Sequence, residues 1–427
     1  MTCEVAILNR MGVALAADSA VTFTQGQRTF ATGANKIFQL STSAPVGVMI
    51  YNGAVLHSVP WELILKSFRT ELAETTFHSL NQYADALVSY IETNASLFPE
   101  ELRDERFAEL CAIAAKGFLE LAPTISPEIR HSEDLALCTL GWNKAVASLR
   151  LQIEASEIHN PFSPDDVAAA VEDNSAWLGE QLAEYVHGHE ELSHLADVIN
   201  YEEVAILSIV SVYRKTDSIV GSSYTGVVLA GFGTKDYFPS CVRLKVKGFV
   251  LDRLLVQHEQ PIVIDHKQNS AIQAFAMKTT VETFLQGVSP GVWAHGIALF
   301  EKHAQEGCQR VLAAAGAVMP VNADDILSKS REDFEDEWVR NLLDEHYGPL
   351  RQVISSLTVD QMAELAENLV MLESLKEKVT SRTQSVGGPI DVAVITRAEG
   401  LVWIKRKLYF APELNHRYFA RHGLSPK

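Results

Sequence analysis

The sequence predicts an α/β (α+β) fold in which helices cover mainly antiparallel sheets. Segments with strand-type patterns and segments with helical spacing occur in separate blocks, in the order strands, helices, strands, helices, strands. Short turns join neighbouring strand segments, as is typical of hairpins. The block order and the turns together indicate a layered architecture.

Strand patterns fill most of the first 53 residues. The segments CEVAILN and GVALAADS flank a short turn around Asn9 to Gly12, and we expect them to form a hairpin. The segments KIFQLS and PVGVMIYNG flank a second turn that contains Pro45, and they predict a second hairpin. The N-terminal block is therefore expected to hold four short strands.

Helical spacing begins at Pro60 and continues with modest breaks to about residue 198. The apolar residues of its first stretch recur at intervals of three and four, namely Trp61, Ile64, Leu65, Phe68 and Leu72. Strand signals return in TGVVLAGFG and CVRLKVKGFVLDRLLV, and a second helical region is expected from about Asn269 to Glu377. The chain closes with the strand pair PIDVAVITRAEG and LVWIKRKLYFAP.

Composition limits the classes of function. The chain has 427 residues, of which 47% are hydrophobic and 21% charged, so it can bury a sizeable core. Its formal charge of −18 and the lack of a Lys/Arg block argue against a nucleic-acid partner. No segment approaches roughly 18 uninterrupted apolar residues, and the N-terminus lacks the features of a secretory signal. We therefore expect a cytoplasmic protein without a membrane partner.

Residues that often bind metals or nucleotides give no strong signal. The five cysteines are scattered without a CxxC pair, which indicates neither a disulfide framework nor a zinc site. His187, His189 and His194 occur in VHGHEELSH, but this acidic segment lacks the HExxH spacing. The GFG of LAGFGTKD is followed by neither a Walker lysine pattern nor GxGxxG, so it indicates a turn. We expect no metal and no cofactor.

The first hairpin brings Thr2 close to a carboxylate. If the two strand segments pair through a two-residue turn at Arg10 and Met11, the numbers of facing residues sum to about 21. Thr2 then lies opposite Ser19 or, after a shift of one residue, opposite Asp18. Both registers place the start of the chain and Asp18 at the same end of the hairpin.

Thr2 is a candidate nucleophile. An initiator methionine before a small residue is normally removed, and Thr2 would then carry a free α-amine. Because such amines have a pKa of about 8, this amine can take the proton from the hydroxyl of the same residue. Lys36 is a candidate for a positive charge that assists this step, and Asp18 is a candidate to hold Lys36 ionised. The N–H of Gly53, placed between a strand and a helix, is a candidate donor to the oxyanion.

These residues resemble the catalytic set of the proteasome β-type subunits, which are N-terminal nucleophile (Ntn) hydrolases. In that family a terminal threonine starts the first strand, an aspartate follows sixteen residues later in an apolar-Ala-Asp pattern, and a lysine opens a Lys-Ile strand. Thr2, Asp18 and Lys36 match these positions, and Gly53 matches a glycine turn after the fourth strand. The late VGGPIDVAVIT is especially similar to the bacterial ancestral-type β-subunit relatives.

The resemblance implies a four-layer αββα sandwich of antiparallel sheets in one domain spanning 1–427, with large helical insertions at about 97–200 and about 300–380. It implies cleavage of peptide or amide bonds by Thr2 after removal of Met1, and assembly into homo-oligomers such as rings. The family has an aspartate and a serine before its late Gly-Gly. This chain has Thr383-Gln384-Ser385-Val386 there, so Ser385, displaced by one position, is the candidate that would orient the amine.

Two other functions stay open at this point. The insertions could restrict access to the site, which would favour a small-amide amidase of the same fold. The aspartate missing before Gly387 would suit a catalytically inactive assembly or binding protein. Cys3 is a competing nucleophile, but it becomes terminal only if Thr2 is also removed.

Overall fold

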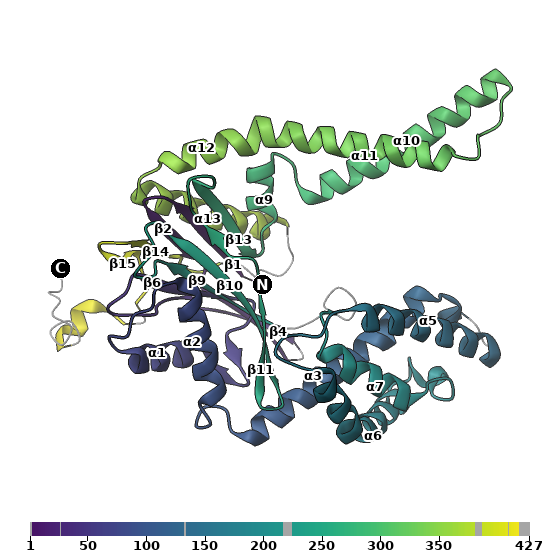
Figure 1. Cartoon of the computed structure of the whole chain (residues 1–427), viewed down its shortest axis with the longest axis horizontal. Helices are drawn as coiled ribbons and strands as arrows, with labels where there is room; N and C mark the ends of the chain where they lie inside the picture. The colour runs from purple at the N-terminus through teal and green to yellow at the C-terminus, as the bar shows by residue number, and fades with distance from the viewer. Residues whose placement is uncertain are drawn as a thin grey trace.

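The computed structural model describes residues 2–25, 27–131, 134–216, 224–380, 387–408 and 410–417. Two antiparallel sheets stack face to face, and helices cover the outer face of each (Figure 1). The α+β fold and the four-layer αββα arrangement that were predicted are therefore confirmed.

The first sheet has the strand order β13-β1-β2-β14-β15. Its strands are β13 (Ser270–Ala276), β1 (Cys3–Asn9), β2 (Gly12–Ala17), β14 (Asp391–Thr396) and β15 (Gly400–Lys405). The second sheet has the order β11-β10-β9-β6-β5, with β12 beside β10. Its strands are β5 (Ile37–Gln39), β6 (Val46–Tyr51), β9 (Thr225–Gly231), β10 (Ser240–Val250), β11 (Arg253–His258) and β12 (Ile262–Val263).

The sequence of β1 shows why the first sheet is buried on both faces. Successive side chains of a strand point to opposite faces. Ala6 and Leu8 pack into the core between the two sheets, whereas Val5 and Ile7 pack under the helices. A strand covered on both sides has no polar face, which explains the nearly continuous apolar run that β1 and β2 display.

The helical layers come from different parts of the chain. The second sheet is covered by α1 (Trp61–Leu72) and α2 (Leu80–Thr93). The first sheet is covered by α9 (Thr279–Gln286), α12 (Gly348–Ser356) and α13 (Val359–Thr380), with the π-helix η2 (Leu343–Tyr347) preceding α12. Helix α13 lies within the second stretch read as an insertion, yet its apolar residues complete the core beneath β1, β2 and β14.

A helical lobe with its own core lies beside the sandwich (Figure 1). Its elements are α3 (Glu100–Ile125), α4 (Glu128–His131), α5 (Leu135–Ala155), α6 (Pro164–Gly188), η1 (Ser193–Leu195) and α7 (Tyr201–Val212). Trp142 and Tyr213 are among its fully buried side chains, and Val250 and Leu255 at the end of the β10–β11 hairpin pack against it. The lobe therefore extends past residue 200 and contacts the second sheet at one point.

A second helical feature projects from the helical layer that covers the first sheet, above the lobe in the view of Figure 1. It consists of α10 (Pro290–Ala315) and α11 (Ala323–Leu342), which run side by side as a helical hairpin that we call the arm. In the part of the chain that the structure describes, no helix is both long enough and apolar enough to cross a bilayer.

Two local expectations differ from the structure. Residues 270–276, placed at the start of the second helical region, form strand β13, because pairing with β1 along seven residues decides the conformation of a segment whose local pattern is ambiguous.

The N-terminal block also holds more than four strands. The additional pair is β3 (Ala20–Gln25) with β4 (Gln27–Thr32), and a small pair, β7 (Val55–Leu56) with β8 (Val59–Pro60), follows β6. Near the other end of the described chain lies the short helix η3 (Pro412–Leu414).

Candidate active site

The register of the first hairpin is as predicted. Glu4 pairs with Ala17 and Asn9 pairs with Gly12, so the numbers of facing residues sum to 21. Beyond the last pair, the Asp18 N–H donates to the Cys3 carbonyl at 3.2 Å. On the other side of β1, the Thr2 carbonyl accepts a hydrogen bond of 3.0 Å from the N–H of Met277, just after β13. The backbone at Thr2 is thereby held from both sides.

The carboxylate of Asp18 joins three separate segments of the chain. It is buried, and its Oδ1 accepts hydrogen bonds from the Cys3 N–H at 3.1 Å and from Lys36 Nζ. Its Oδ2 accepts from the Gly387 N–H at 2.9 Å and from the Ala20 N–H at 3.3 Å. Asp18 therefore fixes the start of β1, the ammonium of Lys36 and the chain before β14 at one point.

Lys36 connects the two sheets. Its carbonyl accepts a hydrogen bond of 2.9 Å from the Ile50 N–H, which holds its backbone on the second sheet beside β6. Its ammonium is bound by Asp18 of the first sheet and lies 3.1 Å from Oε1 of Glu4, which belongs to β1. The Lys36 side chain is 5% exposed, so one positive charge faces two carboxylates out of contact with water.

Glu4 is the functional candidate that the sequence reasoning missed. Its side chain is fully buried on the inner face of β1, and burial raises its pKa from 4.5 to about 7. The positive charge of Lys36 opposes this rise, the negative charge of Asp18 adds to it, and an interaction with the Thr2 hydroxyl lowers the pKa. The detectable signal was a charged residue inside the apolar strand CEVAILN.

Thr2 lies beside this cluster of charges. Thr2 is 7% exposed, and its Oγ1 and both carboxylate oxygens of Glu4 make no well-aligned hydrogen bond with the residues that the structure describes. The neighbouring Cys3 is less suited to nucleophilic attack, because burial, reinforced by Glu4, raises the pKa of its thiol well above the usual value. The hydroxyl of Thr2 is therefore the better placed nucleophile of the two.

The other predicted site residues are arranged less simply. The Gly53 N–H donates to the Tyr51 carbonyl at 2.9 Å, so an oxyanion would have to compete for this donor. A Cβ at Gly53 would meet Thr225 Oγ1 at 2.2 Å, which explains the need for glycine. Ser385 lies outside the described residues. Gly387 contacts the site twice, since its N–H binds Asp18 and its carbonyl accepts from the Ser19 N–H at 3.3 Å.

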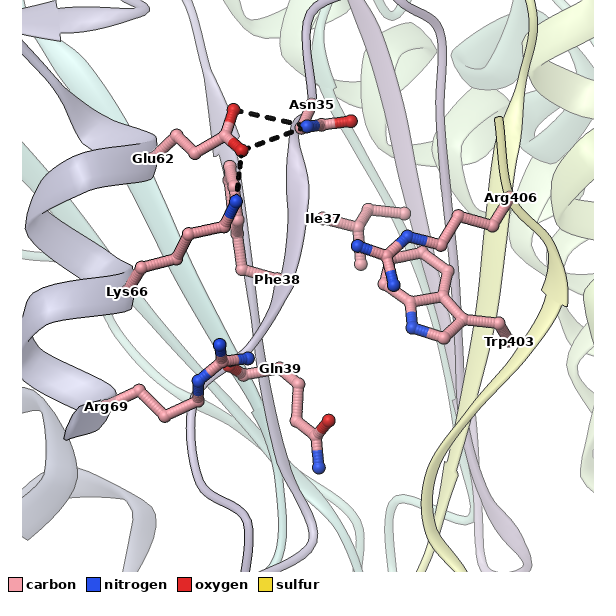
Figure 2. Close-up of a pocket in the computed structure, with 9 residues that line it drawn as sticks. All are labelled: Asn35, Ile37, Phe38, Gln39, Glu62, Lys66, Arg69, Trp403 and Arg406. Carbon is pink, nitrogen blue, oxygen red and sulfur yellow. Dashed lines mark hydrogen bonds and ion pairs between the residues drawn. The ribbon is translucent and has the colours of Figure 1, made fainter. Parts of the chain in front are cut away.

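A small cavity lies beside β5, the strand that follows Lys36. Figure 2 shows the side chains of Lys66, Arg69 and Arg406 around a cavity of about 40 Å³ next to β5. Glu62 accepts hydrogen bonds from Asn35 and Lys66 at its rim.

Among the residues that the structure describes, no group of three or more His, Cys, Asp or Glu side chains is arranged to hold a metal ion.

Comparisons with known proteins give little support for a family. No family model matches the chain, and no curated protein matches it. Among solved structures, a Gly-1 mutant of Anbu from Hyphomicrobium sp. strain MC1 is 8% identical over 99% of this chain and 95% of that chain, with a TM-score of 0.30. Anbu from Yersinia bercovieri, described as an ancestral β-subunit, is 10% identical over 100% and 98%, with a TM-score of 0.29.

These values correct the family prediction. The assignment of the chain to the proteasome β-subunit-like Ntn hydrolases, closest to the bacterial ancestral-type relatives, is wrong. The similarity to Anbu is weak, with 8% and 10% identity and TM-scores near 0.30, and at 427 residues the chain is larger than a proteasome β subunit. The function has to be argued from the site itself.

Proposed function

We propose that the protein is a hydrolase of amide bonds in which Thr2 is the nucleophile once Met1 has been removed. The observation that carries the proposal is the ammonium of Lys36, held between the buried carboxylates of Asp18 and Glu4 at the start of the strand that bears Thr2. Burying three ionisable groups together opposes folding unless they are well paired, and such clusters are concentrated at functional sites.

The proposed reaction needs only groups of this chain and one water molecule. The Thr2 hydroxyl attacks the carbonyl carbon of an amide, while its proton passes to the free α-amine of the same residue. The amine of the substrate then leaves with that proton, and an ester to Thr2 remains. A water molecule, deprotonated by the α-amine, attacks this ester and releases the acid, which restores the Thr2 hydroxyl.

Lys36 and the two carboxylates set the electrostatics of this step. A fixed ammonium favours the alkoxide that develops on Thr2 and disfavours protonation of the nearby α-amine. Asp18 holds the ammonium of Lys36 in place. With a pKa of about 7, Glu4 changes its charge near neutral pH, and its ionised form partly cancels the charge of Lys36. Glu4 is therefore a positioning residue that tunes the nucleophile.

The oxyanion is proposed to be stabilised by the Gly53 N–H. This requires that Gly53 give up or share its present hydrogen bond with the Tyr51 carbonyl when substrate binds. Oxyanion donors often align only in the reacting complex, so the present bond is compatible with the role.

Two classes of substrate follow from the same chemistry: peptides and small amides. Comparing the hydrolysis of long peptides with that of short amides by the same preparation separates the two.

The first test is the intact mass of the protein from its native host. The proposal requires loss of Met1, and a protein that retains Met1 would contradict it. The second test is an electrophile that acylates terminal threonine. It should label the wild type and Thr2→Ser but not Thr2→Ala, with Ser19→Ala as the matched control that keeps labelling. Equal labelling of wild type and Thr2→Ala would remove Thr2 as the nucleophile and favour a non-catalytic assembly protein.

A further inference from the structure

The arm formed by α10 and α11 buries very little of its own surface. Both helices are described throughout, yet Ile297 is the one buried residue that α10 provides and Ala323 the one from α11. Aromatic pairs hold the two helices together, with ring centroids 4.4 Å apart for Trp293–Trp338 and for Phe300–Phe334. Because helices in proteins gain most of their stability from packing, this projecting pair lacks a partner surface.

The far end of the arm is apolar and exposed. The segment VLAAAGAVMPV, residues 311–321, contains no charged or polar side chain and forms the end of α10 and the turn into α11. Within it, Val311 is 69%, Val318 88% and Val321 106% exposed. An exposed apolar surface of this kind marks an interaction site on an otherwise soluble domain. We call residues 311–321 the tip.

The base of the arm offers a groove of matching character. A cavity of about 740 Å³ lies between β13, α9 and the first and last turns of the arm. Its apolar lining residues are Ile272, Ala274, Val281, Leu285, Pro290, Trp293, Val339, Leu342, Leu343 and Tyr347. Val339 and Leu343 remain 42% and 47% exposed there, so the groove presents apolar surface that the described part of this chain leaves uncovered.

The tip cannot reach the groove of its own chain. Trp293 in the groove lies near the beginning of α10 and the tip at its end. A helix of 26 residues spans about 39 Å at about 1.5 Å per residue. A second copy of the chain can bring a tip to this place if its arm runs in the opposite direction.

We propose that two copies of the chain pair arm against arm in antiparallel orientation, so that the tip of each occupies the groove of the other. Such a pair has twofold symmetry, and each arm supplies the same surface to its partner. Two helices, each about 10 Å across and about 39 and about 30 Å long, present a face of about 700 Å² per copy, which is within the usual size of a specific interface.

Charges along the arm suit this orientation. Asp324 and Asp325 follow the tip, whereas Lys278 lines the groove and Arg340 follows Val339 beside it. Lys278 is paired with Glu282, which also lines the groove, so in the antiparallel orientation Arg340 is the cation that faces the aspartates of the partner's tip.

The mass of the particle in solution tests the pairing. Light scattering should give at least a dimer for the wild type, and the double variant Val318→Asp/Val321→Asp should have half the mass or less. Both positions lie in an exposed turn, and an unchanged circular dichroism spectrum and melting temperature would show that the variant folds. Val55→Asp, at an exposed site away from the arm, is the matched control and should keep the wild-type mass. A monomeric wild type, or an unchanged mass of the double variant, would overturn the proposal.

A cross-link tests the specific contact between tip and groove. Cys308 is the exposed cysteine among the described residues, so Cys308→Ser provides the background. Differently tagged Val318→Cys and Leu343→Cys proteins, mixed and oxidised, should form mixed disulfides more readily than either forms disulfides alone. In the control, a Tyr237→Cys protein takes the place of the Leu343→Cys protein. Because Tyr237 lies outside the groove, no mixed disulfides should form. Absence of the mixed disulfide would refute arm pairing. Arm pairing would also be refuted if the wild type binds phosphatidylserine vesicles and the double variant Val318→Asp/Val321→Asp does not.

Discussion

Replacing Glu4 by glutamine should change the pH dependence of stability in a defined way. Glutamine has nearly the same shape and can still accept a hydrogen bond from Lys36, which keeps Asp18 as its charged partner. The substitution therefore removes one ionisation from the core and leaves the packing of β1 intact. The difference between the two proteins reports what the ionisation of Glu4 costs in the folded state.

The size of the effect follows from the pKa of Glu4. Burial raises it from 4.5 to about 7, and this shift already includes the attraction of Lys36. At about 1.4 kcal/mol per pKa unit, the folded state gains about 3 kcal/mol from holding the proton. Because the folded pKa lies above the unfolded one, this contribution is fully present below pH 4.5 and is lost as the pH rises to about 7. Glu4→Gln does not lose it.

Urea denaturation between pH 4.5 and pH 8.5 measures this prediction. The free energies of unfolding of wild type and Glu4→Gln should be similar near pH 4.5, and the variant should be more stable by about 3 kcal/mol above pH 7. A constant difference across this range would refute the reasoning, because Glu4 would then titrate alike in the folded and unfolded chains.

Glu62 provides a control with the opposite sign. Burial raises the pKa of Glu62, but hydrogen bonds from Lys66 and Asn35 outweigh this and leave the pKa below its usual value. Its stabilising contribution is present above the unfolded pKa and is lost as the pH falls through the lower, folded pKa. Glu62→Gln should therefore lose stability at neutral pH and approach the wild type in acid.

Three further predictions concern stability and reactivity. Lys36→Met leaves two buried carboxylates without their cation and should lower the free energy of unfolding by about 3 to 5 kcal/mol. In the same urea titration, Lys66→Met removes the cation of an exposed pair and should change this free energy by less than about 1 kcal/mol. Gly53→Ala should cost about 1 to 3 kcal/mol because its Cβ would lie 2.2 Å from Thr225 Oγ1, and adding Thr225→Ala should recover most of the loss. Iodoacetamide should modify Cys308 before the four buried cysteines, and mass spectrometry of peptides from the native protein checks this order.

The sequence predicted those parts of the site that depend on local geometry. A two-residue turn and the period of two along a strand are enough to place Thr2 and Asp18 at one end of the hairpin, and the observed pairing has that register. Lys36 could be named because it stands at the head of the next expected strand, KIFQLS, although the β3–β4 pair that separates it from β2 was not expected.

The residues that reasoning from the sequence missed depend on contacts between distant segments. Glu4 looks like an ordinary strand residue until the second sheet covers it and brings Lys36 to its carboxylate. The 270–276 segment becomes a strand because β1 offers it a pairing edge, although its own pattern is ambiguous. The Gly53 N–H donates a hydrogen bond to the Tyr51 carbonyl, and the presence of a glycine in the sequence does not reveal this turn.

The sequence by itself determined the register of the first hairpin and the alternation of strand and helix blocks, though not β13 or the β3–β4 pair, because these features follow from the periodicity of apolar residues and the length of a turn. Only the tertiary structure decided the charge environment of Thr2. Asp18 and Glu4 belong to one sheet and Lys36 to the other, so their ion pairs exist only where the two sheets stack. The same stacking removes water from these groups, and that burial is what moves the pKa of Glu4 to about 7.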